Sequence, residues 1–476
     1  MIIDLWQPMM DFDLKKTDRQ EFQKQANALR AGTYKLFLFL FFVWASSPYV
    51  FAADKSEVNR LSKQVERSYQ AAESRGMVFD PQGGLDHYLT YAALHNPGVR
   101  AAFFRWKAAL EKSGYAGSLP DPIFSYGYYV ENVETRVGPQ NQRFSFKQSY
   151  PWFGTLGKKG EAAFEAASAA FQKYQLEKLK LYYRVKTAYY DYYYLGREIQ
   201  LTKDNMELLK YWESVARTKF KTGLIRHPDV IKAQVELGKL EDRLQSVMEM
   251  VDPAVARLRA ALNLPDSVDL PLPTEIVVEA LKLNRDSVWA EALTNNPNLK
   301  AIEHLIRKEE AGVSLAGKAS FPNFTFGVDY IETGYGLNPS ILESGKDPWI
   351  INVSINLPIW FGKNKALRNE ARARLRMAQD NLREAANNLS AFTEQLLFEY
   401  EDAQRKISLY RDGLIPKAEQ SLNASYTAYL AGEADFLSVL DAQRLLLDFE
   451  LKLEWSRTIS AKKLAELELI TGHEKK

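Results

Sequence analysis

Two long stretches of the chain have a helical pattern, in which apolar residues recur every three and four positions. Residues 155–222 contain no proline and follow this pattern throughout, so they predict one helix of about 100 Å. Residues 363–431 repeat the pattern, with a bend expected near Gly413 and Pro416, where glycine and proline weaken a helix. Helices of this length without internal caps predict coiled-coil packing between neighbours.

Shorter helices are predicted beside each long one. A glycine-containing turn follows each long helix and leads into a return helix, over residues 227–263 in the first half of the chain and 436–471 in the second. Another helix precedes the strands of each half, near residues 99–117 and 298–317. The two shorter helices of the first half together approach the length of the long one, so we expect them to lie end to end beside it.

Between these helices the apolar residues recur at every second position, which is the pattern of a β-strand with one apolar and one polar face. The clearest case is residues 349–357, and the others lie at residues 124–131, 144–150 and 324–330. Strands of about ten residues with this alternation have the length and pattern of transmembrane β-strands. The competing interpretation is a soluble hairpin that packs its aromatic face on the helices.

If the strands cross a membrane, their polar face lines a lumen and their ends carry interfacial aromatic residues. The predicted lumen residues are Ser125, Gly127, Glu131, Ser145, Lys147, Ser149, Thr325, Asp329, Asn352, Ser354 and Asn356. The predicted aromatic belt consists of Tyr150, Trp152, Phe153, Trp360 and Phe361. Four strands cannot close a barrel and lipid tolerates no open sheet edge, so the chain must associate through its strands. Two copies would give eight strands with a filled interior, and three copies would give twelve strands around a channel.

The two halves of the chain are copies of one unit. Asn96-Pro97 recurs as Asn296-Pro297, and Trp152-Phe153-Gly154 recurs in the same order as Trp360-Phe361-Gly362. A proline-rich linker lies between the two copies. The predicted organisation is a signal peptide at residues 1–53, an N-terminal extension at 54–84, the first repeat at 85–264, the linker at 265–273, the second repeat at 274–472 and a tail at 473–476.

The signal peptide is predicted from an apolar run at residues 36–45, which follows Arg30 and Lys35 and precedes the small residues Ala52 and Ala53. Cleavage is expected after Ala52 or Ala53. A retained membrane anchor is the alternative, but the run is shorter than the roughly 20 residues that a spanning helix needs. No later apolar run approaches that length, so we expect an exported protein without transmembrane helices.

The amino-acid composition limits the chemistry and the partners that we expect for this protein. The chain has 62 Lys and Arg against 60 Asp and Glu, so its net charge of +2 gives no electrostatic reason to expect nucleic acid as a partner. The absence of cysteine excludes disulfides, thiolate metal sites, cysteine nucleophiles and cysteine lipidation. The five histidines lack helical metal-ligand spacing, and the phosphate-loop, G-x-S-x-G and H-E-x-x-H patterns are missing. We therefore expect no catalytic residue, no cofactor, no metal site and no enzymatic activity.

The order of helix, two strands, long helix, glycine-containing turn and return helix, given twice after a signal peptide, resembles the TolC family of outer membrane efflux proteins. The resemblance is carried by Asn96-Pro97, the strand exit Trp152-Phe153-Gly154 and residues 429–443, and it covers about residues 85–472. It implies a mainly α-helical fold with a transmembrane β part, in which a homotrimer forms a twelve-stranded barrel in the outer membrane above a periplasmic barrel of long antiparallel helices. It also implies an exit duct for efflux or secretion that works with a periplasmic adaptor and an inner-membrane transporter.

In this family the helical-hairpin turns form periplasmic tips, which meet the adaptor and close the resting channel. The residues that match the tips or the acidic positions near them are Gly223, Leu224, Arg226, Gly432, Glu433, Asp435, Glu419 and Asn423. Asn423 stands where some members have an acidic residue, so the three carboxylates are the candidates for a ring that favours cations. The simpler interpretation is that each glycine ends its helix in the left-handed conformation, and both interpretations can hold together.

The alternative function is an exported periplasmic coiled-coil scaffold or adhesin whose strands never contact lipid. Such a protein shares the helices and the signal peptide with a channel and differs in where its strands lie. The two hypotheses are therefore separated by whether the apolar face of the strands lies in a membrane.

Overall fold

The computed structural model describes residues 53–75, 78–223, 227–276, 281, 283–338 and 340–473. The chain divides into two compact units, Met1–Val58 and Asn59–Lys476, and the fold and the site lie in the second. The predicted signal peptide falls outside the described residues except at its last position, so it stays a prediction from the sequence.

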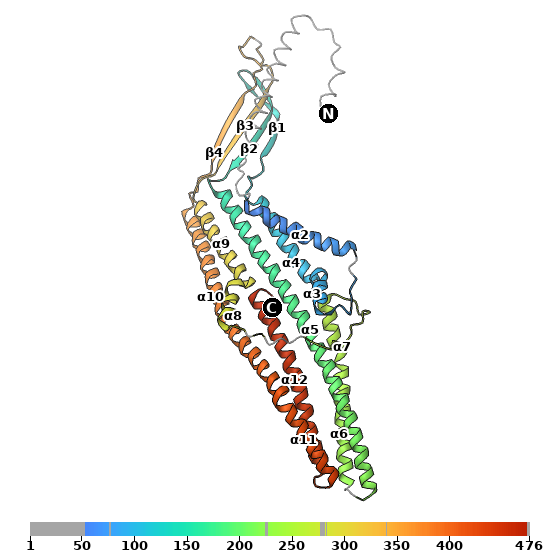
Figure 1. Cartoon of the computed structure of the whole chain (residues 1–476). Helices are drawn as coiled ribbons and strands as arrows, with labels where there is room; N and C mark the ends of the chain where they lie inside the picture. Colours follow the sequence, from blue (N-terminus) through green and yellow to red (C-terminus); the bar gives the residue numbers. More distant parts are fainter. Residues whose placement is uncertain are drawn as a thin grey trace. The chain divides into compact units, whose positions relative to one another are not determined.

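Helices and strands follow one another in the same order in both halves of the chain (Figure 1). The first half contains α2 (Ala53–Arg75), α3 (Gly84–His95), α4 (Pro97–Tyr115), β1 (Ile123–Thr135), β2 (Gly138–Tyr150), α5 (Thr155–Lys221), α6 (His227–Glu249) and α7 (Val251–Leu262). The second half contains α8 (Arg285–Asn295), α9 (Pro297–Lys318), β3 (Phe324–Thr333), β4 (Trp349–Ile355), α10 (Phe361–Ser408), the π-helical turn η2 (Leu409–Leu414), α11 (Ile415–Ala431) and α12 (Phe436–Thr471). The sequence pattern had predicted all of these elements except α2, α3 and α8.

The two long helices confirm the prediction from periodicity. α5 continues without a break for 67 residues, between Gly154 and Gly223. In the second repeat the π-helical turn η2 separates α10 from α11 at the predicted bend. Pro416, at the start of α11, has no backbone N–H to donate, and its ring crowds the carbonyl of Asp412. The helix widens at this point because the regular hydrogen-bonding pattern cannot continue through the proline.

The prediction of one continuous return helix in the first repeat is wrong. The helix breaks at Met250, between α6 and α7. Pro253 lies at the third position of α7, where it cannot donate the hydrogen bond that would join it to the carbonyl of Glu249. The return helix of the second repeat contains no proline and forms the single 36-residue helix α12.

The repeated Asn-Pro pair has the same role in both halves. Asn96 caps α4 by accepting hydrogen bonds from two backbone N–H groups of the first turn, and its amide donates to the carbonyl of Ala261 at 3.1 Å. Asn296 caps α9 in the same way and donates to the carbonyl of Ile470 at 2.9 Å. Each Asn thus begins one short helix and ties it to the end of the return helix, which holds the two in line.

The long helices are flanked by the short ones (Figure 1). α5 packs against α4, α6 and α7 of its own repeat and against α9 and α12 of the other, and α10 packs against α9 and α12. The short helices therefore lie along the long ones, as their combined length predicted. Both long helices, α5 and α10, pack on α9 and on α12. The two repeats are therefore joined through these two helices of the second repeat.

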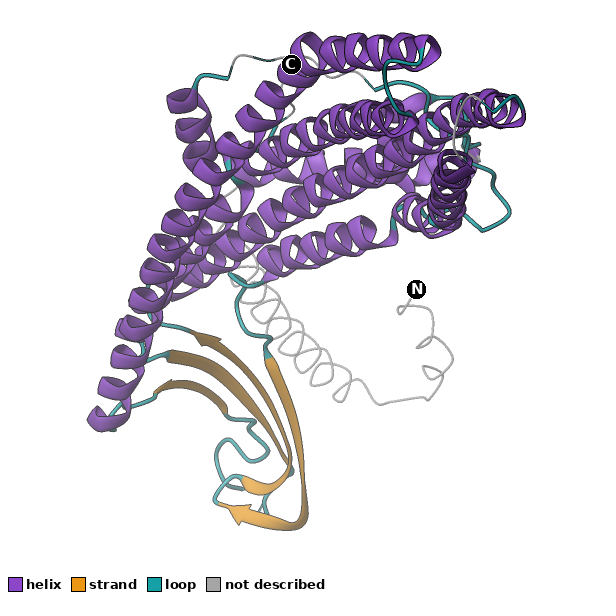
Figure 2. Ribbon diagram, turned by 90° about the horizontal axis from the view of Figure 1, so that it is seen from below, coloured by secondary structure: helices purple, strands orange, loops and turns teal. Residues whose placement is uncertain are grey.

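The strands form one curved antiparallel sheet in the order β1-β2-β3-β4 (Figure 2). β2 of the first repeat pairs with β3 of the second, which joins the repeats a second time. β1 and β4 are edge strands, and each has one side that no other strand of the described residues pairs with. The sheet continues directly into the helices, because Trp152-Phe153-Gly154 leads from β2 to α5 and Trp360 leads into α10.

Candidate channel site

The pairing of the strands puts most of the predicted lumen residues on one face of the sheet. Ser145 of β2 pairs with Ser125 of β1 on one side and with Asp329 of β3 on the other. Ser149 pairs with Thr325, and their hydroxyl groups are hydrogen-bonded at 2.8 Å. Because directly paired residues of neighbouring strands share a face, these positions form a single polar face.

The other predicted lumen residues follow the same alternation with two exceptions. Those on the polar face are Gly127, Lys147, Asn352 and Ser354. Glu131 falls in the register shift of β1 between Tyr128 and Val133, so the pairing assigns it to neither face. Asn356 lies beyond the end of β4, where its side-chain oxygen accepts a hydrogen bond from the backbone of Asn323.

A charged pair lies within the polar face. The buried carboxylate of Asp329 forms an ion pair with Arg143 and accepts a hydrogen bond from Asn352 at 2.7 Å. The sequence prediction missed Arg143, although this residue continues the alternation of β2 two positions before Ser145. Its partner could not be predicted from periodicity, because β2 and β3 belong to different repeats and their register is a long-range property.

The opposite face of the sheet is apolar and exposed in the single chain. Phe124, Phe146, Val328 and Ile351 form one paired row across all four strands. Phe124 is 65% exposed and Ile351 is 80% exposed, whereas Asp329 on the polar face is buried. This arrangement is the reverse of that in a soluble protein, and it suits a sheet with lipid outside and water inside.

Aromatic side chains gather where the sheet meets the helices. Trp152 stacks on Phe321 with ring centres 4.8 Å apart, and Tyr150 contacts Phe326 edge to face. The most exposed of the predicted belt residues are Phe153, Trp360 and Phe361. Phe321 was not predicted as part of this group, although its position directly before the proline that leads into β3 was a usable signal. Large exposed rings at this level are typical of a membrane interface.

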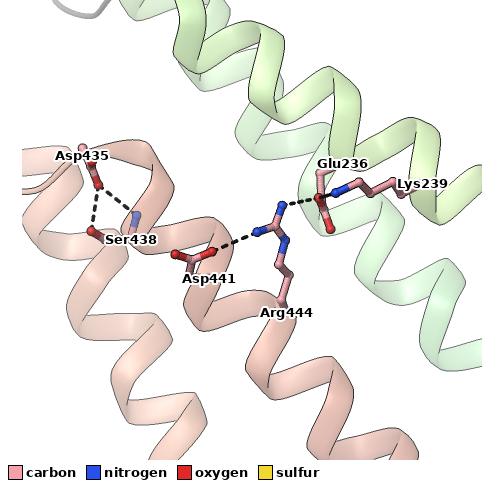
Figure 3. Close-up of polar contacts among 6 residues, drawn as sticks. All are labelled: Glu236, Lys239, Asp435, Ser438, Asp441 and Arg444. Carbon is pink, nitrogen blue, oxygen red and sulfur yellow. Dashed lines mark hydrogen bonds and ion pairs between the residues drawn. The ribbon is translucent and has the colours of Figure 1, made fainter.

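The turns of the two helical hairpins contain glycine in the left-handed region. Gly223 and Gly432 have φ of 75° and 81°, which side chains with a Cβ rarely adopt. Beyond the second turn, Asp435 caps α12 by accepting hydrogen bonds from the backbone N–H of Ser438 at 3.0 Å and from its hydroxyl at 2.8 Å (Figure 3). The predicted tip residues that lie outside the described part of the chain are Leu224 and Arg226.

Polar contacts made by Arg444 and Lys219 join the first hairpin to the second near these turns. Arg444 of α12 forms an ion pair with Glu236 of α6 and a second one with Asp441 at 3.0 Å (Figure 3). The hydrogen bond from Arg444 holds the pKa of Glu236 below its ordinary range. Lys219 of α5 donates to the carbonyl of Tyr429 at 3.1 Å and lies over the ring of the same residue. The sequence prediction missed these contacts because the partners belong to different repeats.

The remaining predicted acidic residues are spread along the second hairpin. Glu433 is exposed in the turn, whereas Glu419 and Asn423 lie in α11, about 18 and 12 Å back along the helix from Ala431. No hydrogen bond joins these side chains to one another in the described chain. Burial raises the pKa of Glu450 on α12, and the negative charge of Glu419 raises it further. Within the described chain the predicted carboxylates Glu419, Glu433 and Asp435 therefore do not form a cluster with one another.

Among the residues that the structure describes, no helix combines the length and apolar character needed to cross a membrane. No group of three His, Cys, Asp or Glu side chains there is arranged to hold a metal ion. The expected absence of a metal and of a cofactor stays a prediction from the sequence.

Sequence comparison relates the chain to proteins of the bacterial outer membrane. Residues 288–473 match the family model described as outer membrane efflux protein. Nodulation protein T of Rhizobium leguminosarum bv. trifolii is 22% identical over 70% of this chain and 72% of its own length. The toluene efflux pump outer membrane protein TtgF of Pseudomonas putida is 24% identical over 74% of this chain and 69% of its own.

Solved structures with the same fold agree with this relation. The outer membrane protein VceC of Vibrio cholerae has a TM-score of 0.68 at 17% identity, over 82% of this chain and 96% of that one. The MtrE outer membrane channel of Neisseria gonorrhoeae has a TM-score of 0.66 at 20% identity, over 82% and 89%. Together with the match at residues 288–473, the fold and the two-faced sheet indicate an outer membrane efflux channel with a helical part in the periplasm. The second repeat matches the outer membrane efflux protein family, and both repeats carry the TolC-type motifs.

Proposed function

We propose that three copies of this protein form an exit duct through the outer membrane, with a twelve-stranded barrel in the membrane and a barrel of long helices in the periplasm. The observation that carries the proposal is the sheet, which has an exposed apolar face, a polar face with an ion pair on the buried carboxylate of Asp329, and two edges that are unpaired within the described chain. Open edges are not tolerated in lipid, so β1 of one copy must pair with β4 of the next. Eight strands fill their own interior, whereas twelve leave room for a channel.

The helical part has surfaces suited to the same association. α4 exposes the large apolar side chains Phe104 and Tyr115, and α10 exposes Met377 and Phe398. Within the chain α4 and α10 pack on different helices: α4 packs on α5, and α10 packs on α9 and α12. Apolar patches on two different elements support a head-to-tail ring, in which a patch of one copy covers a different patch of the next.

The proposal includes two partners and a closed end. We propose that the hairpin tips contact a periplasmic adaptor and close the resting duct, and that an inner-membrane transporter supplies the energy. Support comes from relatives named as outer membrane proteins of efflux pumps, and from the contacts Arg444–Glu236 and Lys219–Tyr429, which join the hairpins near the tips. A duct that only conducts solutes needs no catalytic group, so we propose no enzymatic activity for this chain.

The test uses the absence of cysteine from the chain. Single variants Val353→Cys and Ser354→Cys place a thiol on the apolar and the polar face of β4, at two neighbouring positions that are both exposed in the single chain. In isolated outer membranes we expect a water-soluble maleimide to label Ser354→Cys and to leave Val353→Cys unlabelled, because lipid covers the second thiol. Equal labelling of both, or recovery of the protein in the soluble periplasmic fraction, would favour the scaffold or adhesin.

A further inference from the structure

A row of cations lies on α10 directly below the aromatic belt. Lys365, Arg368, Arg372 and Arg376 are spaced by three and four positions, so they share one face of the helix with Phe361, the belt residue at its start. All four cations are exposed. Within the described chain none of the four forms an ion pair, in contrast to Arg374, which pairs with its own helix at 2.6 Å. We refer to the four cations as the basic face.

The basic face is separate from the surfaces that α10 uses for packing. The helix packs on α9 through a face that contains the buried residues Asn364 and Ala378. The exposed residues Ala366 and Ala373 lie roughly opposite that face, on the side where the next copy is proposed to pack. At about 100° per residue the basic face lies between these two surfaces, so it stays open in the proposed ring.

The geometry of the helix directs the basic face toward the membrane surface. α10 begins at the belt, and the four residues lie about 6 to 22 Å along the helix from Phe361. Side chains of a helix tilt toward its N-terminus, and Lys and Arg have long flexible stems, so their charged ends reach back toward the belt. The N-terminus of α10 adds the positive end of the helix dipole, and no side chain caps it.

We propose that the basic face binds the phosphate headgroups of anionic phospholipids in the periplasmic leaflet of the outer membrane. The proposal rests on the proposed function, because the belt must lie at the membrane surface for the basic face to lie beneath it. Attraction to an anionic surface falls off within a Debye length of roughly 8 to 10 Å, so Lys365 and Arg368 contribute most, and Arg372 and Arg376, which lie further along the helix, contribute less. Arg383 continues the same face about 33 Å from Phe361, farther from the surface than any of the four, and it pairs with Asp380 at 3.4 Å.

The experiment compares lipid retention by matched variants of the full chain. The test variant K365Q/R368Q/R372Q/R376Q removes the charges and keeps residues that favour a helix. The variant K363Q/R374Q removes two cations from the opposite face of the same helix, and R383Q removes the distant one. Each protein is reconstituted in nanodiscs of phosphatidylethanolamine with a minor fraction of phosphatidylglycerol, and retained lipid is counted by native mass spectrometry. We expect the test variant to lose phosphatidylglycerol retention by roughly tenfold or more, and both controls to stay within about twofold of the wild type.

The possible outcomes separate this proposal from the proposed function. Unchanged phosphatidylglycerol retention by a test variant that still forms pores overturns the lipid site and leaves the duct standing. Loss of oligomer without loss of lipid assigns the basic face to contact between copies and also overturns the proposal. Displacement of the lipid by inorganic phosphate alone identifies a site for free anions and overturns it as well. A wild-type protein that forms no pores contradicts the duct itself.

Discussion

Single residues near the tips are placed to hold the proposed duct closed. Glu236 is buried against α12, and its carboxylate is shared between Arg444 from the other hairpin and Lys239 from its own helix (Figure 3). A buried carboxylate that loses its cation pays a desolvation cost, so the pair resists separation of α6 from α12. Arg444 is therefore the residue whose removal should loosen one hairpin from the other.

We expect Arg444→Gln to increase the conductance of the protein in planar bilayers several-fold, because the variant weakens the link between the hairpins. Lys239→Gln is the matched control: Lys239 contacts the same carboxylate at 3.3 Å but does not cross to α12. Its conductance should stay at the wild-type value. An equal rise in both variants would show that the total charge around Glu236, rather than the contact between hairpins, controls opening.

The same pair predicts a response to acid. The pKa of Glu236 in the folded protein lies below its ordinary value of 4.5, chiefly because Arg444 hydrogen-bonds to the charged form. A group with a lowered pKa contributes stability above its unfolded pKa and loses that contribution as the pH falls through the folded value. We expect the link to be intact at neutral pH and to weaken as the pH falls below about 4.5, with a rise in conductance. Glu236→Gln should lack the part of the acid response that comes from Glu236. An identical rise in conductance at low pH in the variant would assign the effect to other carboxylates.

The secondary-structure elements show which properties of the fold are local. The long helices and the strands could be predicted because their periodicity lies within each segment, and the bend before Pro416 follows from proline alone. The break at Met250 was missed because the helix is interrupted three residues before Pro253, the residue that causes the interruption. The ion pair of Arg143 with Asp329 was beyond prediction, since it requires the register between strands of different repeats. The same limit applies to the contacts near the tips.

The repeated asparagine caps give a prediction at the scale of elements. Asn296→Ala removes the cap of α9 and the hydrogen bond to the carbonyl of Ile470, so we expect a loss of about 1–3 kcal/mol in the free energy of unfolding. Asn96→Ala should have a similar effect, because it removes the same two contacts in the first repeat. Thermal unfolding of the detergent-solubilised protein measures both. Asn298→Ala, an exposed position in the first turn, is the control, and an equal loss there would contradict the role given to the caps.

At the scale of the whole molecule, the sheet exposes surfaces in a single chain that an assembly in a membrane would cover. The polar face buries the carboxylate of Asp329, while in the described chain the apolar face and both sheet edges are left uncovered. Lipid and two neighbouring copies would cover these surfaces at once. The near-neutral charge of the chain means that any selectivity of the duct has to arise from local groups such as Lys147 on the polar face.

The most direct test of the duct is the conductance of single channels formed by Ser354→Cys while a bulky water-soluble thiol reagent is added. Ser354 lies on the polar face of β4, so each copy would place one thiol in the lumen. We predict three successive decreases in the current of one channel, one for each copy, and no decrease for Val353→Cys, whose thiol faces lipid. A current that the reagent leaves unchanged in Ser354→Cys, or blockade in a different number of steps, would contradict a trimeric channel lined by the polar face of this sheet.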